Sequence, residues 1–485
     1  MPSVKKNFIW STVLTLAGYV FPLITFPYIT RVLGVEGIGS IQFADSTISY
    51  FCIFAMLGIG TVGVREIAKS KDDKHELSRV FSSLLFINLL FTVLSIIFLI
   101  LLIQFIPSFE SHSKLLYIGV SRILCTAFVA EWFFKGIEDF RYITICSIII
   151  RSLYVISVLI FVRDANDYIL YFLLTTLTYV FNVIVNLVYL KKFVNITFDN
   201  LNFRPYVKPI VILGIYSILT QMYGSFNVIF LGDRCGDIEV GYYSTTVKLF
   251  GIIMSVFSAF TGVMLPRMSS LLSEGKKEEF KNVTSKSIDF LLIFCFPIII
   301  IAEVFAPQIV TIIAGHGYEG AILPLQIVMP LMLIIGYEQI IIIQMLMPLE
   351  KDNAILTNSI LGASIAIILN FLIVPRFAAV GTAIVWIACE IAVGLSAQFF
   401  VTKYTGYKFP FKKIFRYILA YLPALAGCVF ILEQIQYGYM SFVVGILFIG
   451  CYFFGIEYYV LKNQIWIELV GSVIKRAKQS MNCNS

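Results

Sequence analysis

The chain has 485 residues, of which 59% are hydrophobic and 13% are charged. A soluble domain carries about 25% charged residues, so this composition excludes a soluble globular protein. Apolar runs of about 20 residues recur along the chain, and each is long enough to cross a hydrocarbon core of about 30 Å. The net charge of +7 needs no nucleic acid, because basic residues facing anionic lipid account for it.

Fourteen apolar segments are predicted to span the membrane, which makes the fold class all-α and polytopic. Lys5 and Lys6 precede the first segment. That segment is too long for the core of a signal peptide and no small-residue cleavage site follows it, so we interpret it as a membrane helix. In chain order the segments cover residues 8–30, 38–62, 81–106, 115–135, 142–162, 168–190, 210–231, 242–266, 288–313, 323–347, 354–374, 380–401, 414–433 and 439–461.

The distribution of Lys and Arg predicts the orientation of these spans. If the N-terminus is cytoplasmic, 28 of the 36 basic residues fall in inner loops and tails. The outer loops then hold only Arg31, Lys114, Arg163, Arg234 and Arg376. Because cytoplasmic loops carry an excess of Lys and Arg, both termini are predicted to be cytoplasmic.

The second half of the chain resembles the first. Residues 39–83 align with 241–285 at a constant offset of 202, and "GIEDFRYIT" (136–144) resembles "PLEKDNAIL" (348–356) at an offset of 212. The pair Leu33-Gly34 matches Leu231-Gly232 if the intervening loop differs by four residues. Spans 1–6 and 7–12 are therefore predicted to be two copies of one unit.

The repeat predicts three parts: an N-terminal lobe at 1–208, a second lobe at 209–403, and spans 13 and 14 with a cytoplasmic tail at 404–485. Six spans per copy is an even number, so both copies face the same way and are related by an axis along the membrane normal. Two such lobes favour a cavity between them and transport by alternating access.

Ionisable residues inside the spans are the candidate functional residues, since such groups normally face a cavity or a partner. Asp45, Arg122 and Lys248 each lie about seven residues from the outer end of a span, about 10 Å deep. Asp45 is also one position from the repeat equivalent of Lys248. Arg151 lies nearer the middle of its span. These groups suit a partly cationic cavity for an anionic headgroup, or they pair with each other and fix helix packing.

Three acids in the second half are candidates for carrying a coupling proton or sodium ion: Glu303, Glu338 and Glu390. Local pairing is the alternative for each of them. The only histidines, His75, His112 and His316, fall outside the spans, and "GVEGIG" does not fit a phosphate-binding loop. No metal site and no cofactor are predicted, apart from coupling to H⁺ or Na⁺.

Four sequence blocks resemble those of polysaccharide, or O-antigen, repeat-unit flippases of the multidrug/oligosaccharidyl-lipid/polysaccharide exporter superfamily. They are "FPYITRVLGVEGIGSIQFADS" (26–46), "AEWFFKGIEDFRYIT" (130–144), "GYYSTTVKL" (241–249) and "MLPRMSSL" (264–271). The resemblance implies that the protein moves undecaprenyl-diphosphate-linked oligosaccharide from the cytoplasmic to the periplasmic leaflet of the bacterial inner membrane. It also implies that spans 13 and 14 form a groove for the lipid tail.

On this interpretation Arg31, Arg122, Arg151 and Lys248 would bind the diphosphate, and Asp45 would enter the cavity on span 2. The partners would be the lipid-linked oligosaccharide and membrane lipids, together with a polysaccharide polymerase and a chain-length regulator. Two alternatives share the fold: a lipid II flippase and a cation-coupled multidrug exporter. An enzyme is disfavoured, because no outer loop exceeds about a dozen residues and no span contains a histidine.

Overall fold

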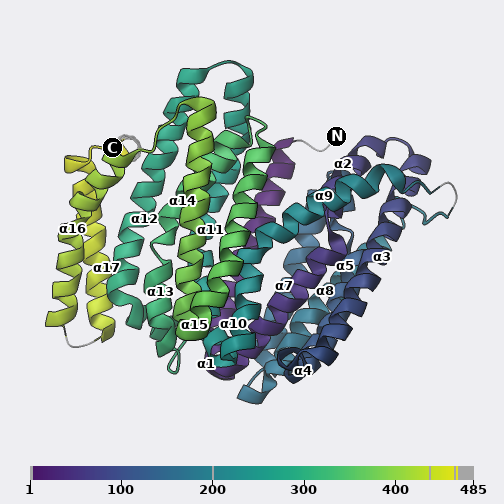
Figure 1. The fold of residues 1–485 in the computed structure, drawn as a ribbon, viewed down its shortest axis with the longest axis horizontal. Helices are drawn as coiled ribbons and strands as arrows, with labels where there is room; N and C mark the ends of the chain where they lie inside the picture. The colour runs from purple at the N-terminus through teal and green to yellow at the C-terminus, as the bar shows by residue number, and fades with distance from the viewer. Residues whose placement is uncertain (1–3, 199–200, 436–437, 464–465, 468–485) are drawn as a thin grey trace, which may run out of the picture. The chain divides into compact units, whose positions relative to one another are not determined.

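A computed structural model describes residues 4–198, 201–435, 438–463 and 466–467 (Figure 1). The described residues are almost all helical, and none of them lies in a strand. The first part of the chain forms α1 (Val4–Met56), α2 (Ile59–Ser70), α3 (Lys74–Phe105), α4 (Pro107–Ser111), α5 (Ser113–Val129), α6 (Glu131–Gly136), α7 (Phe140–Phe161), α8 (Tyr168–Leu190), α9 (Arg204–Gln221) and α10 (Asn227–Cys235). The rest forms α11 (Asp237–Ser273), α12 (Lys277–Ile313), α13 (Ile322–Val328), α14 (Leu331–Ile341), α15 (Asp352–Thr405), α16 (Phe411–Gln434) and α17 (Gly438–Gly455).

The chain divides into two compact units. Unit 1 contains Met1–Thr245, Ile313–Gly320 and Ala366–Thr382. Unit 2 contains Thr246–Ile312, Ala321–Ile365 and Ala383–Ser485. Each unit is described by itself below.

The structure confirms an all-helical membrane fold but not the count of fourteen spans. By length and composition, ten helices of the described chain could cross a membrane, or up to twelve if two bent pairs each count as one. Two of the long helices each cover two predicted spans. α1 is interrupted only at Gly34, and α15 only at Ala378. At each of these hairpin turns, a single non-helical residue is enough to form the turn.

The repeat is visible in the backbone of unit 1. Gly34 has φ 69° and ψ 176°, and Gly236 has φ 85° and ψ 178°. This positive φ is accessible to glycine at little cost. The two glycines are 202 residues apart, which is the offset of the aligned segment that follows them. The predicted four-residue gap was therefore wrong, and the counterpart of Gly34 is Gly236 rather than Gly232.

The two copies cross at a second pair of glycines, five residues further on. The backbone of Asp237 occupies the space where Gly39 would carry a Cβ, and the backbone of Val35 does the same at Gly241. At the offset of 202, Gly39 corresponds to Gly241 and Val35 to Asp237. The contact thus maps onto itself, as expected at a pseudo-two-fold axis.

The more distant match at an offset of 212 also has a structural basis. Glu138 and Glu350 both have positive φ, 63° and 55°. The residues that follow, Asp139 and Lys351, have nearly the same conformation at the start of α7 and α15 (φ −89°, ψ 59° and φ −93°, ψ 51°). Both copies therefore turn in the same way before these helices.

An aromatic core holds the N-terminal helices of unit 1 together. Trp132 and Phe133 of α6 are buried, and Trp132 stacks on Phe81 of α3 with ring centroids 5.5 Å apart. α2 reaches this core because Gly63 has no side chain where the Trp132 ring lies. The sequence block "AEWFFKG" is thus a packing element.

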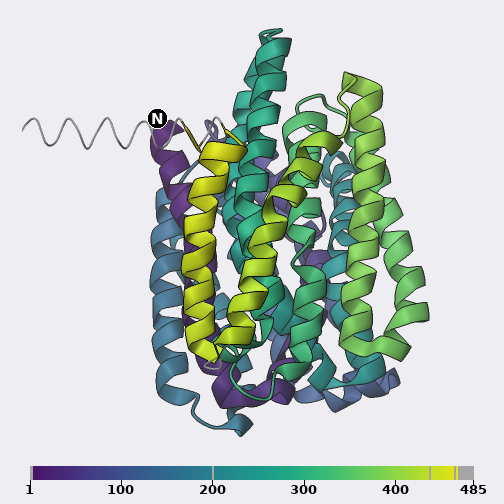
Figure 2. The ribbon, with the colours of Figure 1, turned by 90° about the vertical axis from the view of Figure 1, so that its left-hand side faces the viewer.

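In unit 2, the last two helices form an antiparallel pair. α16 and α17 pack against each other (Figures 1 and 2). Gly427 of α16 lies against the Phe448 ring of α17, and Gly445 of α17 lies against the Phe305 ring of α12. Small residues at these points let the helices approach closely, as is typical of helix packing in membranes.

Candidate functional site

Asp45 and Arg122, two of the predicted site residues, form an ion pair in unit 1. Asp45 lies on α1 and Arg122 on α5, and Arg122 Nη1 donates a hydrogen bond to Asp45 Oδ1. Arg122 Nη2 donates to Ser49 Oγ, one turn further along α1, at 3.1 Å. The prediction that Asp45 and Arg122 share one layer of the membrane agrees with this contact.

The guanidinium of Arg122 is held on three sides. Its Cζ lies 4.4 Å from the ring centroid of Tyr179 on α8, a cation–π contact that fixes the plane of the fork. The Arg122 side chain is 11% exposed, and that of Asp45 is 35% exposed. Nε of Arg122 is buried without a hydrogen-bond partner among the described residues. The carboxylate is thus the accessible half of the pair.

Arg151 lies on α7 and is half-buried. Its Nη1 would lie 3.3 Å from a Cβ on Gly18 of α1, so the absence of a side chain at Gly18 leaves room for the guanidinium. Within the described part of the chain, Arg151 forms no ion pair and no hydrogen bond. It therefore differs from Arg122, whose charge is already matched by an acid.

Arg31 is exposed and binds backbone. Nη1 donates to the carbonyl oxygen of Pro27 at 2.5 Å and to that of Ile313 at 3.1 Å. Ile313 is the last residue of α12, and cations are favourable beside the free carbonyls at a helix C-terminus. Arg31 thus ties α1 to the end of another helix.

Lys248, the fourth predicted cation, belongs to unit 2. It lies on α11 and is half-buried. No ion pair or hydrogen bond of Lys248 occurs among the residues that the structure describes.

Two of the predicted acids meet in unit 2. Glu338 of α14 is 6% exposed and Glu390 of α15 is 9% exposed, and the two carboxyl groups lie close enough to interact electrostatically. Glu390 Oε1 also accepts from Nε1 of Trp386 at 2.9 Å. Two neighbouring carboxylates in a dry interior repel each other, so protonation of one of them would stabilise the pair. Glu303 is separate: it is half-buried on α12, and its carbonyl oxygen accepts from Gln326 Nε2 at 2.7 Å.

One buried acid was missed by the sequence analysis. Glu457, in the turn that ends the last span, is fully buried and accepts hydrogen bonds from the hydroxyls of Tyr417 (3.0 Å) and Tyr421 (2.9 Å). The signal was an acidic residue four positions inside the end of an apolar run. The two tyrosines, spaced i and i+4 on α16, were not distinguishable in sequence from residues of the lipid interface.

A second missed feature lies at the repeat axis of unit 1. His112, between α4 and α5, pairs with Asp237 at the start of α11 through Nε2 and Oδ1, 2.9 Å apart. Ser40 donates to the other oxygen of Asp237. Burial alone would lower the pKa of His112, but the hydrogen bond and charge of Asp237 outweigh it and raise the pKa above the ordinary value of 6.5.

The charged groups thus offer two kinds of chemistry. Unit 1 holds a planar cation, Arg122, whose present partner Asp45 could be replaced by an anionic ligand, and a second cation, Arg151, with no matched acid in the described chain. Unit 2 holds a carboxyl pair that can take up or release a proton. The first suits binding of a phosphate group, and the second suits coupling to protons.

Comparison with known proteins gives consistent matches along the chain. The sequence model of a family described as "Polysaccharide biosynthesis protein" matches residues 4–272. A "Putative O-antigen transporter" of Escherichia coli (strain K12) is 25% identical over 394 residues, which cover 81% of this chain and 95% of that protein. The "Capsular polysaccharide biosynthesis protein CapF" of Staphylococcus aureus is 22% identical over 412 residues, covering 81% and 98%.

Solved structures match the fold. "Lipid II flippase MurJ, inward closed conformation" superposes with a TM-score of 0.70 at 16% identity, covering 94% of this chain and 99% of that one. An inward-facing multidrug resistance MATE family transporter of the MOP superfamily gives a TM-score of 0.62 at 15% identity, covering 81% and 100%. At these identities the likeness concerns the fold alone.

Proposed function

Because the chain belongs to the polysaccharide biosynthesis protein family, we propose that it is a flippase for lipid-linked oligosaccharide repeat units of a surface polysaccharide such as O-antigen or capsule. The observation that carries this proposal is the family match over residues 4–272, together with O-antigen transporter relatives that align along 81% of the chain. The protein translocates its substrate by alternating access and does not modify it.

The substrate is an oligosaccharide linked to undecaprenyl diphosphate, and its diphosphate is bound by cations within the spans. Arg122 is the principal one, because its fork can form two charge-assisted hydrogen bonds to a phosphate once Asp45 is displaced. Arg151 and Lys248 contribute positive charge, and Arg31 attracts the headgroup at the outer surface. Asp45 regenerates the resting pair after release.

Transport is coupled to a cation, and a proton fits the geometry of unit 2 best. Glu338 and Glu390 are both buried and interact with each other, and a proton on one of them would relieve the repulsion between the two carboxylates. Glu303 is a further candidate on α12. The protein lies in the bacterial inner membrane with both termini in the cytoplasm, where it delivers repeat units to a polysaccharide polymerase and its chain-length regulator.

The proposal is tested by locating the substrate in a deletion strain. Lipid-linked oligosaccharides are extracted from intact spheroplasts before and after treatment with a membrane-impermeant glycosidase. We expect undecaprenyl-diphosphate oligosaccharide to accumulate in a protected form, with surface polymer lost and both defects reversed by the wild-type gene.

Two other outcomes would redirect the assignment. Accumulation of protected lipid II with normal surface polymer would favour a lipid II flippase. Normal surface polymer, no protected intermediate and raised sensitivity to cationic drugs would favour a multidrug exporter.

A further inference from the structure

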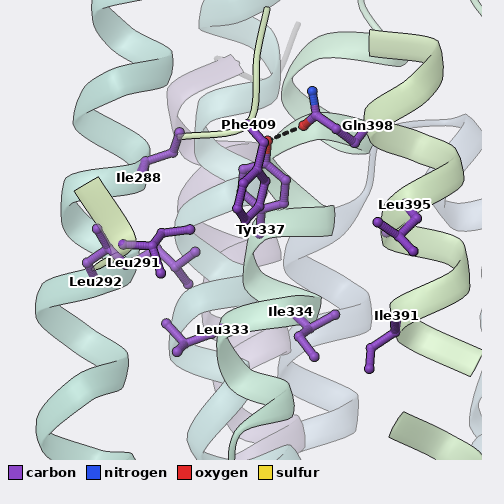
Figure 3. Close-up of a pocket in the computed structure, with 12 residues that line it drawn as sticks. Ile288, Leu291, Leu292, Leu333, Ile334, Tyr337, Ile391, Leu395, Gln398 and Phe409 are labelled. Carbon is purple, nitrogen blue, oxygen red and sulfur yellow. Dashed lines mark hydrogen bonds between the residues drawn. The ribbon is translucent and has the colours of Figure 1, made fainter. Parts of the chain in front are cut away.

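Two adjoining cavities in unit 2 are not used by the proposed transport path. The first is apolar, with a volume of about 490 Å³, and is lined by α12, α14, α15 and the start of α16 (Figure 3). The second, of about 510 Å³, lies at the ends of α11 and α12 and around the link between α15 and α16. Both volumes fall within the usual range for ligand pockets, about 300–1,000 Å³.

The apolar cavity offers almost no hydrogen bonding to a ligand. Its walls include Leu291, Leu333, Ile391 and Leu395. Its polar side chains, Tyr337 and Gln398, are already hydrogen-bonded within the protein. Tyr337 donates its hydroxyl proton to Gln398 Oε1, a contact visible in Figure 3, and Gln398 Nε2 donates to the Tyr407 carbonyl oxygen at 3.0 Å. Such a cavity suits a hydrocarbon chain.

The second cavity is basic. Lys277, Lys281 and Lys408 line it, and none of the described residues in its wall is acidic. Thr284, Tyr404 and Tyr407 add hydroxyl groups. Lys281 pairs with Glu278 at 3.0 Å, but both side chains are largely exposed, so the pair holds the lysine only weakly. The three ammonium groups and the hydroxyls suit an anionic headgroup.

The two cavities are neighbours along the same elements. On α12, Thr284 faces the basic cavity, and Ile288, one turn later, faces the apolar one. On the link between α15 and α16, Tyr407 and Lys408 line the basic cavity and Phe409 lines the apolar one. The hydrogen bond from Gln398 to Tyr407 joins the two walls. A basic space and an apolar space thus lie next to each other, an arrangement that matches the headgroup and acyl chain of a lipid.

We propose that these cavities bind one anionic phospholipid of the cytoplasmic leaflet, with its phosphate among Lys277, Lys281 and Lys408 and an acyl chain in the apolar cavity. Charge complementarity identifies this occupant. Basic pockets at the cytoplasmic ends of membrane helices attract anionic headgroups. The C-terminal segment is an unsuitable occupant, because it carries Lys475, Arg476 and Lys478.

The test measures binding of phosphatidylglycerol to the full-length protein by native mass spectrometry, with phosphatidylcholine as the uncharged reference. We expect phosphatidylglycerol to bind preferentially and the preference to fall with added salt. The variant K277Q/K281Q/K408Q should lose roughly a hundredfold in affinity, at roughly fivefold for each lysine near an anionic lipid. The control K69Q/K71Q/K74Q removes the same charge from another inner surface and should bind as wild type.

A second variant tests the acyl chain. Leu395→Trp, which fills the apolar cavity, should also weaken binding, whereas Leu447→Trp at another exposed position should not. The proposal is overturned if the wild type binds both lipids equally, if either test variant binds like its control, or if undecaprenyl diphosphate binds there and phosphatidylglycerol does not. Binding is measured without oligosaccharide, so the result is independent of the transport assignment.

Discussion

Residues 34–46 begin at the turn inside α1, and residues 236–248 are their equivalents in the second copy. The two segments have the same backbone conformation at their glycines but carry different charges. Gly34 and Gly236 take the same positive-φ conformation, and Gly39 and Gly241 make equivalent close contacts. At the offset of 202, however, Asp45 corresponds to Val247, and Lys248 has no basic counterpart because Ser46 takes its place. The first copy presents an acid, and the second presents a base.

This difference indicates what each copy contributes. Duplicated glycines maintain the crossing of the two hairpins, and this role is symmetric. The charged positions differ between the units: Asp45 pairs with Arg122 in unit 1, whereas in unit 2 Glu338 lies beside Glu390 and Glu457 accepts hydrogen bonds from tyrosine hydroxyls. The same substitution made at equivalent positions of the two copies should therefore have equal effects on the protein at the glycines and unequal effects at the charged positions.

The largest effect is expected from Arg122→Ala, which should lower transport about 100-fold, because a charge-assisted bidentate contact to phosphate is worth several kcal/mol. Together with Lys248→Ala, it should abolish flipping and leave membrane insertion intact. The measurement is the rate of oligosaccharide translocation in a complemented deletion strain. Arg163→Ala, at an exposed arginine between α7 and α8, is the matched control and should transport normally.

A double variant separates substrate binding from packing at the same position. D45N/R122Q removes both charges at once, so no lone charge remains buried. If Arg122 binds the diphosphate, this variant folds and remains inactive. Wild-type transport by D45N/R122Q would show that the pair serves packing alone.

The glycine crossing gives the next prediction. Gly39→Ala and Gly241→Ala each place a Cβ where backbone of the other copy lies, so each should destabilise the protein by about 1–3 kcal/mol or more. Gly60→Ala is the control, since a Cβ there meets nothing within 4 Å. Thermal unfolding in detergent compares the three variants. A large difference between Gly39→Ala and Gly241→Ala would contradict the symmetric role.

The carboxyl pair of unit 2 predicts proton coupling. If one proton moves per cycle, each unit of an imposed pH gradient should change substrate distribution about tenfold, the equivalent of 1.36 kcal/mol. Glu338→Gln and Glu390→Gln should transport at a rate that no longer responds to the gradient. Glu457→Gln, at a buried acid bonded to two tyrosine hydroxyls, is the control and should keep the response. A gradient response that survives both substitutions would assign the coupling to other groups.

The smallest effect concerns His112 at the repeat axis. Its pKa in the folded protein is above the ordinary 6.5, so its pairing with Asp237 stabilises the fold fully below pH ~6.5 and is lost as the pH rises through the raised pKa. We expect a loss of about 1 kcal/mol or less across that window. His112→Gln should flatten this pH dependence in thermal unfolding. An unchanged slope in the variant would show that His112 is not the group responsible.

Much of the fold was predictable because hydrophobic runs and basic loops are strong signals in a membrane chain. The sequence did not predict that α1 and α15 each run through two spans. A single non-helical residue, such as Gly34 or Ala378, is too short to be recognised as a loop in the sequence. The four-residue gap was predicted because the residue pair Leu-Gly occurs at 33–34 and again at 231–232. The backbone shows that the conformation of Gly34 recurs at Gly236, where the preceding residue is Cys235 and no Leu-Gly pair marks it.

The candidate site was predictable in part for a similar reason. Depth along a span brought Asp45 and Arg122 to one layer, and they are in contact. The depth of a residue along its span does not show which neighbouring helix the residue faces. The sequence therefore did not predict that Glu338 lies beside Glu390. Glu457 was missed because its hydroxyl partners Tyr417 and Tyr421 come from another helix.

The most direct test of the account is translocation by the purified protein. Proteoliposomes containing undecaprenyl-diphosphate oligosaccharide are treated with an impermeant glycosidase, and the protected fraction is followed over time. The account predicts that wild-type protein makes the whole pool accessible, that D45N/R122Q leaves the inner-leaflet half protected, and that protein-free liposomes do the same. Equal protection with and without wild-type protein would contradict it.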